Sequence, residues 1–230
     1  MRYLIFVLFY LSSISFCYTQ ENTVKEVDSL YKEDQFYAGV TYNLLGRKPE
    51  KLNQSGFSLG FHLGFIKDMP INKDRNIAIG IGLGYSTNSF NQDLFINKNN
   101  ANVFEYSIIE DRQTYSKNKF SIHLIEIPIE FRWRSSTPTD YNFWRIYTGF
   151  KFGYTIAANS KYEGDLGRIK YTDNTDFNKF QYGLTLSAGY NTWNIHVYYA
   201  LNSIFSENAK INGENLDAHA IKIGLMFYIL

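Results

Sequence analysis

Apolar and polar side chains alternate with period two through most of the chain beyond residue 35, and this spacing is typical of β-strands. Between residues 57 and 65, for example, the odd positions hold Phe or Leu, while the even positions hold Ser, Gly or His. Similar segments recur to the end of the chain. The pattern predicts eight strands, approximately over 36–45, 56–67, 76–88, 117–134, 143–158, 179–191, 193–204 and 217–229.

The predicted strand over 117–134 contains a change of phase. Its large apolar residues occupy even positions up to Leu124 and odd positions from Ile125 onward. One extra residue at this point is what a β-bulge would supply. Pro128, on the polar face, cannot donate a ladder hydrogen bond and therefore counts against a central position for this strand.

The composition of the two faces decides between classes of β-protein. A soluble sandwich buries its large apolar side chains and exposes polar ones. Here most of the 16 glycines lie opposite the large apolar residues, together with Ser, Thr and charged side chains. A face rich in glycine indicates close backbone approach or a crowded interior. The pattern therefore predicts an all-β fold, an eight-stranded antiparallel up-and-down transmembrane β-barrel with its apolar face toward lipid. A soluble sandwich is the alternative.

Long and short connections alternate between the predicted strands. Transmembrane barrels of this class have long outer loops and short periplasmic turns, so we expect both termini to be periplasmic and the stretches 89–116 and 159–178 to lie outside the cell. The three tryptophans Trp133, Trp144 and Trp193 come at strand ends beside predicted periplasmic turns. Their shared level predicts an interfacial aromatic girdle.

Eight strands leave an interior that side chains just fill, so we expect a plugged barrel without a solute channel. Unpaired charges there would be costly, and the inward charged groups are therefore expected to form a structural hydrogen-bonded network. In it, Glu126 and Glu130 should face Arg145 and Lys151 on the neighbouring strand. The expected inward set is Glu126, Glu130, Arg132, Arg145, Lys151 and Lys222, joined by His62, His123 and His196.

The first nineteen residues predict a secretory signal peptide. Arg2 precedes a short apolar stretch, and the small residues Cys17 and Thr19 suit cleavage between Thr19 and Gln20. A membrane anchor needs a longer apolar core, and a lipoprotein site needs a small residue where Phe16 stands. The predicted organisation is a signal peptide over 1–19, a polar lead-in over 20–35 and a barrel domain over 36–230.

Composition adds three constraints. The chain has 23 basic and 22 acidic side chains, so it lacks the positive footprint of a nucleic-acid-binding protein. Its one cysteine is removed with the predicted signal peptide, which excludes disulfides in the mature chain. Aromatic residues make up 18% of the sequence, and this composition favours an all-β chain because aromatic residues are enriched in strands.

Motifs for catalysis or cofactor binding are absent from the sequence. It contains no phosphate-binding loop, GxGxxG, HExxH, CxxC or GxSxG pattern, and we expect no cofactor. The histidines are spread over different strands, so we expect no metal site, although His62, His123 and His196 could converge in the lumen. Some small outer-membrane barrels act on envelope lipid, but His123 and Glu126 have no serine at a convincing spacing. We therefore expect no enzyme.

The stretch 89–116 mixes apolar residues with charges, which allows two interpretations. It is either a β-rich extension that contacts a partner or ligand, or a hairpin that extends the barrel above the membrane. The apolar residues include Phe90, Leu94, Phe95, Ile96, Phe104, Tyr106, Ile108 and Ile109.

Two segments resemble a known family. Leu124-Ile-Glu-Ile-Pro-Ile-Glu-Phe-Arg132 resembles the "L-E-I-P-L" strand motif of PorT-like proteins, the eight-stranded outer-membrane barrels of Bacteroidetes, with Glu126 and Pro128 at the characteristic positions. The following Ile146-Tyr-Thr-Gly-Phe-Lys-Phe-Gly-Tyr154 is similar to the next strand of that family. The last seven residues, Gly224 to Leu230, resemble the signal read by the barrel-assembly machinery, although they end in Leu instead of Phe.

The resemblance implies an integral outer-membrane barrel and a link to type IX secretion or surface assembly. The expected function is a non-enzymatic structural or interaction component. Its expected partners are outer-membrane lipid, the barrel-assembly machinery and secretion-system or surface proteins, with no nucleic acid. An envelope-lipid-modifying enzyme and a small diffusion pore are the alternatives.

Overall fold

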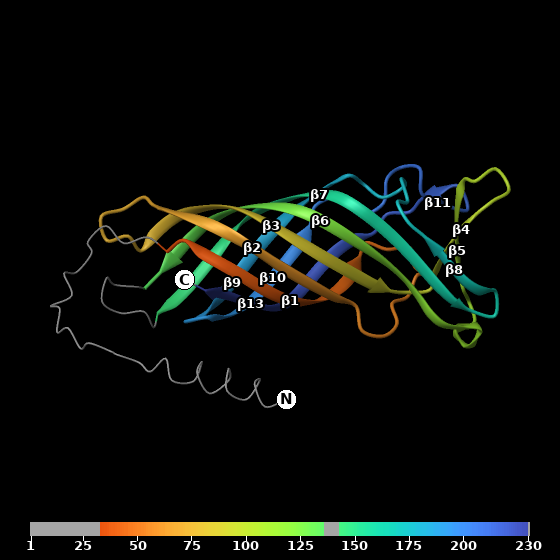
Figure 1. The fold of residues 1–230 in the computed structure, drawn as a ribbon, viewed down its shortest axis with the longest axis horizontal. Helices are drawn as coiled ribbons and strands as arrows, with labels where there is room; N and C mark the ends of the chain where they lie inside the picture. The colour runs from red at the N-terminus through yellow and green to blue at the C-terminus, as the bar shows by residue number, and fades with distance from the viewer. Residues whose placement is uncertain (1–32, 136–142, 230) are drawn as a thin grey trace, which may run out of the picture.

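The computed structural model describes residues 33–135 and 143–229, and within them eight long antiparallel strands form one closed barrel (Figure 1). Each strand pairs with its neighbours in sequence, and the first pairs with the last, which gives an up-and-down topology. The strands are β1 (Gln35–Gly46), β2 (Leu59–Pro70), β3 (Ile77–Asn91), β6 (Tyr115–Arg134), β7 (Trp144–Gly164), β9 (Phe180–Tyr190), β10 (Trp193–Ala200) and β13 (His219–Ile229). The fold predicted from the alternation is confirmed.

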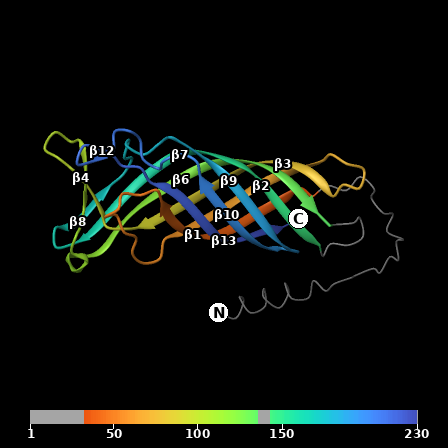
Figure 2. The ribbon, with the colours of Figure 1, turned by 180° about the vertical axis from the view of Figure 1, so that it is seen from behind.

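The two ends of the barrel differ. The described chain begins and ends at one of them, the termini end, where β2 and β3 are joined by residues 71–76, and β9 and β10 by residues 191–192. The opposite end, the loop end, carries short extra elements (Figures 1 and 2). These are β4 (Leu94–Lys98), β5 (Phe104–Ile108), the 3-10 turn η1 (Arg112–Thr114), β8 (Gly167–Tyr171), β11 (Lys210–Ile211) and β12 (Glu214–Asn215). The stretch 89–116 contains the β4–β5 hairpin, which agrees with both interpretations of this stretch.

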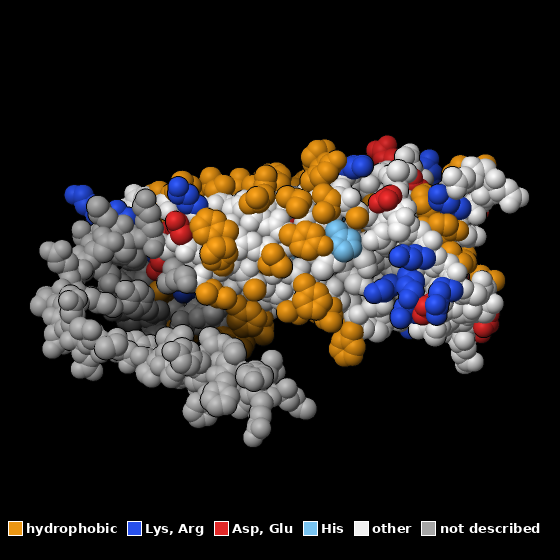
Figure 3. Space-filling view, in the orientation of Figure 1, with side chains coloured by type: hydrophobic (Ala, Val, Ile, Leu, Met, Phe, Trp, Pro, Cys, Tyr) orange, Lys and Arg blue, Asp and Glu red, His pale blue; other side chains and the backbone are white. Residues whose placement is uncertain are grey.

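Exposed large apolar side chains from all eight barrel strands form a band on the outside of the barrel, and Figure 3 shows one side of it. The row from Phe57 to Phe65 shows the pattern, because its odd residues are 37–81% exposed while His62 between them is only 3% exposed. Along the 11 residues of β9 the band runs from Phe180 to Tyr190. Ten steps of ~3.3 Å at a strand tilt of ~40° give a height of ~25 Å, which matches the apolar band of an outer-membrane barrel.

Glycine allows neighbouring strands to pack closely around the lumen. A Cβ on Gly149 would lie 2.0 Å from the carbonyl oxygen of Ile129, and one on Gly224 would lie 2.0 Å from that of Val40. The first contact joins β7 to β6 and the second joins β13 to β1. No side chain larger than hydrogen fits at these crossings without moving backbone.

The predicted bulge exists, but it lies on the other strand of the pair. Leu124 pairs with Thr155 and His123 pairs with Ala157, so the extra residue is Ile156 on β7. From Asn118 to Arg134 the even-numbered residues of β6 remain inward, and Phe120, Ile122 and Leu124 are buried. The apparent change of phase in β6 therefore reflects a change in the filling of the lumen, from charged to apolar, and not an inserted residue.

Pro128 lies in β6, which has neighbouring strands on both sides, although the sequence pattern counted it against such a position. It pairs with Lys151 of β7, whereas the ladder to β3 skips the positions opposite Pro128 and Ile127. The ring packs toward Gly82, where a Cβ would lie 3.1 Å from Pro128 Cγ. The missing N–H is thus confined to one side of the strand, and a glycine provides the space for the ring.

The predicted signal peptide lies outside the described residues, as does the lead-in up to residue 32. Gln35 belongs to β1 and is buried, so the strand begins one residue before the expected boundary. Within the described part of the chain, no helix has the length and apolar character needed to cross a membrane.

Candidate functional site

The six charged residues expected in the lumen are all buried there. Glu126, Glu130, Arg132, Arg145, Lys151 and Lys222 come from β6, β7 and β13, and each is at most 4% exposed. Successive residues of a strand point to opposite faces, and each of these six residues occupies a position whose side chain points into the lumen. Five of them belong to two separate clusters, and Arg145 has no ion-pair partner among the described residues.

The central cluster surrounds the carboxylate of Glu126. Lys151 Nζ lies 3.4 Å from Glu126 Oε2, and Lys222 Nζ lies 3.9 Å from Oε1. Ser86 donates a 2.7 Å hydrogen bond to Oε1, and His62 Nδ1 lies 3.8 Å from Oε2. Both oxygens of the Glu126 carboxylate therefore have a cationic neighbour, which a buried carboxylate requires.

The second cluster lies toward the termini end and is centred on Asp68. Arg132 Nη1 lies 2.8 Å from Asp68 Oδ1, while Arg134 contacts both carboxylate oxygens at 2.9 Å. Glu33 and Gln35 add contacts to these guanidinium groups. Arg132 also lies 3.5 Å from Glu130 Oε2 and 4.1 Å from the ring centroid of Tyr147. This cluster closes the lumen with ionic and cation–π contacts.

Two expectations about the network are wrong. Arg145 does not face Glu130: its guanidinium lies 4.5 Å from the ring centroid of Phe143, with no carboxylate in ion-pair range among the described residues. His123 does not face inward, because it is odd-numbered on a strand whose even residues are inward. Its Nδ1 lies 2.7 Å from the hydroxyl of Tyr85 on the outer wall.

Sequence reasoning missed Asp68, Glu33, Gln35 and Arg134. The predicted strand 56–67 stopped one residue short of Asp68, and Glu33 and Gln35 were assigned to the lead-in. The available signal was the phase: Asp68 continues the even-numbered inward face of β2, and Arg134 continues that of β6. Extending each alternation by one step would have placed both in the lumen.

The loop end is closed by an apolar cluster, which we call the loop-end cap. Phe120 is its centre, with ring centroids of Phe90, Phe177 and Phe205 at 5.0–5.3 Å. The β4–β5 hairpin contributes Leu94, Ile96 and Tyr106. Tyr106 donates a 3.0 Å hydrogen bond to Asp176, and burial raises the pKa of the Tyr106 hydroxyl.

Between the cap and the central cluster, the lumen holds a void of about 10 Å³, lined by residues that include Leu124, Glu126 and Tyr198. This is room for about one water molecule.

Aromatic side chains border the outer band at both edges. At the termini end, Trp133, Trp144 and Trp193 are 39%, 62% and 63% exposed on the outer wall. At the other edge lie the exposed rings of Tyr154 and Phe180, which contact each other at 5.4 Å, together with Tyr42, Tyr182 and Tyr199. The second belt was not predicted, because its residues come from strand ends next to long connections.

The chemistry available in the described residues is limited. No group of three or more His, Cys, Asp or Glu residues there could hold a metal ion. The Tyr85–His123 pair is accessible on the outer wall, but no carboxylate among the described residues orients the imidazole. An activated nucleophile requires such a chain of three groups.

Comparison with known proteins identifies the family. A sequence family described as outer membrane protein beta-barrel domain matches residues 19–206, which include β1 to β10. No curated protein matches the sequence. One solved structure that matches is Ail, the attachment invasion locus protein of Yersinia pestis, with 12% identity, 87% of this chain and 100% of that chain covered, and a TM-score of 0.33. Because the family match spans most of the chain, this protein belongs to the outer membrane protein beta-barrel domain family and is an integral barrel of the outer membrane.

Proposed function

We propose that this protein is a non-enzymatic outer-membrane barrel that serves as a structural or interaction component of the cell envelope. The observation that carries the proposal is the filling of the lumen. Charged clusters occupy its centre and one end, and the loop-end cap occupies the other. A pore needs an open axis, and an enzyme needs an accessible set of convergent groups.

The termini end faces the periplasm in this proposal, and the loop end faces outward. The connections support this orientation, since those at the termini end are short and those at the loop end are long and carry extra strands. The barrel-assembly machinery would then meet β13 from the periplasmic side. Labelling of a cysteine introduced at Asn100, between β4 and β5, by a membrane-impermeant maleimide on intact cells would support it; labelling only after lysis would contradict it.

The interaction role is assigned to the loop end. The β4–β5 hairpin projects beyond the barrel (Figure 1) and exposes both Asn100 and Val103. A photocrosslinking residue at position 100 should capture a discrete protein in living cells. The matched control is position 129 in the apolar band, which should capture only lipid. If position 100 gives no protein adduct in any growth condition, the interaction role is wrong.

A role in type IX secretion or surface assembly is the specific form of this proposal. Its support is the PorT-like motif from Leu124 to Arg132. In β6 this motif contributes Glu126, Glu130 and Arg132 to the ion clusters of the lumen, and it contains Pro128. Deletion of the gene should then leave secretion cargo inside the cell, and normal surface delivery of cargo would count against it.

The alternatives make different predictions. A lipid-modifying enzyme predicts altered lipid A or phospholipid species in a deletion strain, whereas the proposed role predicts unchanged mass spectra. A diffusion pore predicts conductance in planar bilayers, whereas a filled lumen predicts none.

A further inference from the structure

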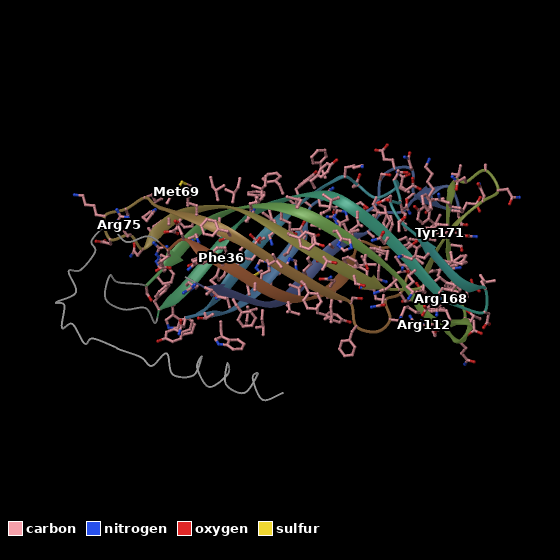
Figure 4. The ribbon with its side chains drawn as sticks, in the orientation of Figure 1. Phe36, Met69, Arg75, Arg112, Arg168 and Tyr171 are labelled. Atoms are coloured by element: carbon pink, nitrogen blue, oxygen red, sulfur yellow. The ribbon has the colours of Figure 1, made fainter. Side chains whose placement is uncertain are left out.

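Five cationic side chains and one carboxylate lie together on the outer wall at the loop end, where β6, β7 and β8 lie side by side, and three of the cations contact the carboxylate. Figure 3 shows Lys and Arg side chains around an acidic one beyond the apolar band, and Figure 4 labels Arg168 and Arg112 in this region. We call this surface the basic patch. It consists of Lys117, Lys119, Lys161, Arg168 and Lys170 with Glu163.

The strand register arranges the basic patch in two rows. Lys119 pairs with Lys161, which pairs with Lys170, so three lysines stand directly opposite one another on adjacent strands. In the next row Lys117 and Arg168 flank Glu163, at 3.6 Å and 3.1 Å from its carboxylate. Lys161 lies 2.9 Å from the same carboxylate, and this contact lowers the pKa of Glu163.

Like charges directly across a strand pair are destabilising. A single carboxylate cannot neutralise five cations, so the basic patch keeps a net positive charge in the folded barrel. An external anion would remove this repulsion, and ammonium and guanidinium groups at this spacing suit phosphate or carboxylate groups of a partner.

The height of the basic patch above the apolar band limits which lipid headgroups can reach it. The apolar band ends on β6 at Ile125, and polar residues Ser121 and His123 follow before Lys119. Six residues at ~3.3 Å and a tilt of ~40° put Lys119 ~15 Å above the band. Glycerophospholipid headgroups extend only ~5–7 Å beyond the hydrocarbon. A bulkier headgroup is needed to reach this level.

A hollow adjoins the basic patch at Lys117. It has a volume of about 350 Å³ and is lined by residues that include Lys117, Arg112 and Phe57. Phe57 is 81% exposed and follows Gly56, whose carbonyl accepts a 3.4 Å hydrogen bond from Tyr42 at the edge of the band. The hollow is thus lined by an exposed aromatic ring, Phe57, and by two cationic side chains, Arg112 and Lys117.

We infer that the basic patch and the adjoining hollow bind the anionic sugar headgroup of the outer-leaflet glycolipid. This inference rests on the outward orientation of the loop end in the proposed function. The lysine rows contact phosphate and carboxylate groups on the sugars, and the apolar band below contacts the acyl chains of the same lipid. The barrel is thereby anchored to a ring of glycolipid on its β6–β7–β8 side.

The test compares lipopolysaccharide affinity for folded barrels in neutral detergent micelles. In the variant Lys119→Gln/Lys170→Gln, each lost lysine removes one surface charge, and affinity should fall about 30-fold with a shallower salt dependence. The matched control Lys67→Gln/Lys73→Gln removes two exposed lysines at the termini end and should bind like the wild type. The variant Glu163→Gln makes the basic patch more positive and should bind more tightly.

Folding of each variant is checked by heat-modifiable gel migration, and the lysine variant should be at least as stable as the wild type because repulsion has been removed. The affinities of the same variants for phosphatidylglycerol vesicles and for soluble dextran sulfate are measured as well. Equal affinity of wild type and lysine variant for lipopolysaccharide would overturn the inference. So would an equal loss of affinity for phosphatidylglycerol or dextran sulfate, which would show a general anion site.

The outward orientation of the loop end and the glycolipid site can be contradicted independently of each other. If the Asn100 cysteine is labelled only after lysis while purified protein shows the predicted lipopolysaccharide affinities, the orientation in the proposed function is wrong. If labelling succeeds on intact cells and the lysine variant binds normally, only the glycolipid site is wrong.

Discussion

At the scale of single residues, Asp68 shows how the lumen holds two guanidinium groups. Its side chain is fully buried, and both oxygens accept contacts from Arg132 and Arg134 at 2.8–2.9 Å. Removing one partner of a buried ion cluster leaves the remaining charges uncompensated, which costs more than the loss of one hydrogen bond.

Asp68→Asn should therefore lower the free energy of unfolding by about 3–5 kcal/mol, measured by urea titration of the barrel in lipid vesicles. Asp74→Asn is the control, since Asp74 is exposed in the turn between β2 and β3, and it should change stability by less than about 0.5 kcal/mol. Equal stability of the two variants would show that Asp68 does not hold the cluster together.

Gly149 tests the close packing of β6 and β7. Gly149→Ala puts a Cβ 2.0 Å from the Ile129 carbonyl, so the strands must separate, and the variant should lose at least about 1–3 kcal/mol. Gly153→Ala on the same strand is the control, because its nearest neighbour is Leu124 Cδ2 at 3.0 Å, and it should fold in normal yield. The measurement is the folded fraction on heat-modified gels; similar yields would contradict the crowded interior.

At the scale of elements, β6 and β7 divide into two parts with opposite filling. Within the apolar band, the odd-numbered residues from Ile125 to Trp133 face outward. The charged residues between them face inward. Beyond it, Phe120 and Ile122 face inward while Lys119 and Ser121 face outward, as in a soluble protein. The long strands thus carry a membrane-spanning segment and a loop-end segment without interruption.

The period-two pattern was sufficient to predict the eight barrel strands, their faces and the inward position of residues such as Glu126 and Lys151. It was insufficient for ion pairing, since alternation fixes which face a side chain occupies and not its rotamer; Arg145 contacts Phe143 for that reason. It also placed the extra residue of the bulge in β6 instead of β7, because the exchange of apolar and polar faces near Leu124 looks in the sequence like a change of phase.

Tyr106 tests the link between the β4–β5 hairpin and the loop-end cap. Burial raises the pKa of Tyr106, so its hydroxyl stays protonated below about pH 10 and can donate to Asp176. Tyr106→Phe removes this bond, and amides 104–108 should exchange about ten-fold faster in hydrogen–deuterium exchange. Tyr199→Phe, in the outer band, should leave their exchange unchanged. Unchanged exchange in Tyr106→Phe would show that the hairpin is held by its apolar contacts alone.

At the scale of the whole molecule, the polarity of the barrel within the band is the reverse of that of a soluble protein. Its exposed surface there is apolar and aromatic, while ionised groups lie near the axis. Such an arrangement is stable only where the surrounding medium is hydrocarbon, because in water the same surface would associate. The family match and the height of the band both agree with this placement.

Depth-dependent quenching of tryptophan fluorescence by brominated phosphatidylcholines tests this placement most directly. All three tryptophans of the sequence lie exposed on the outer wall at the termini edge of the band. Bromines near the headgroup should quench their emission strongly, bromines near the chain ends should quench it less, and aqueous acrylamide should quench it little. Insensitivity to every brominated lipid, with strong quenching by acrylamide, would contradict a lipid-facing band.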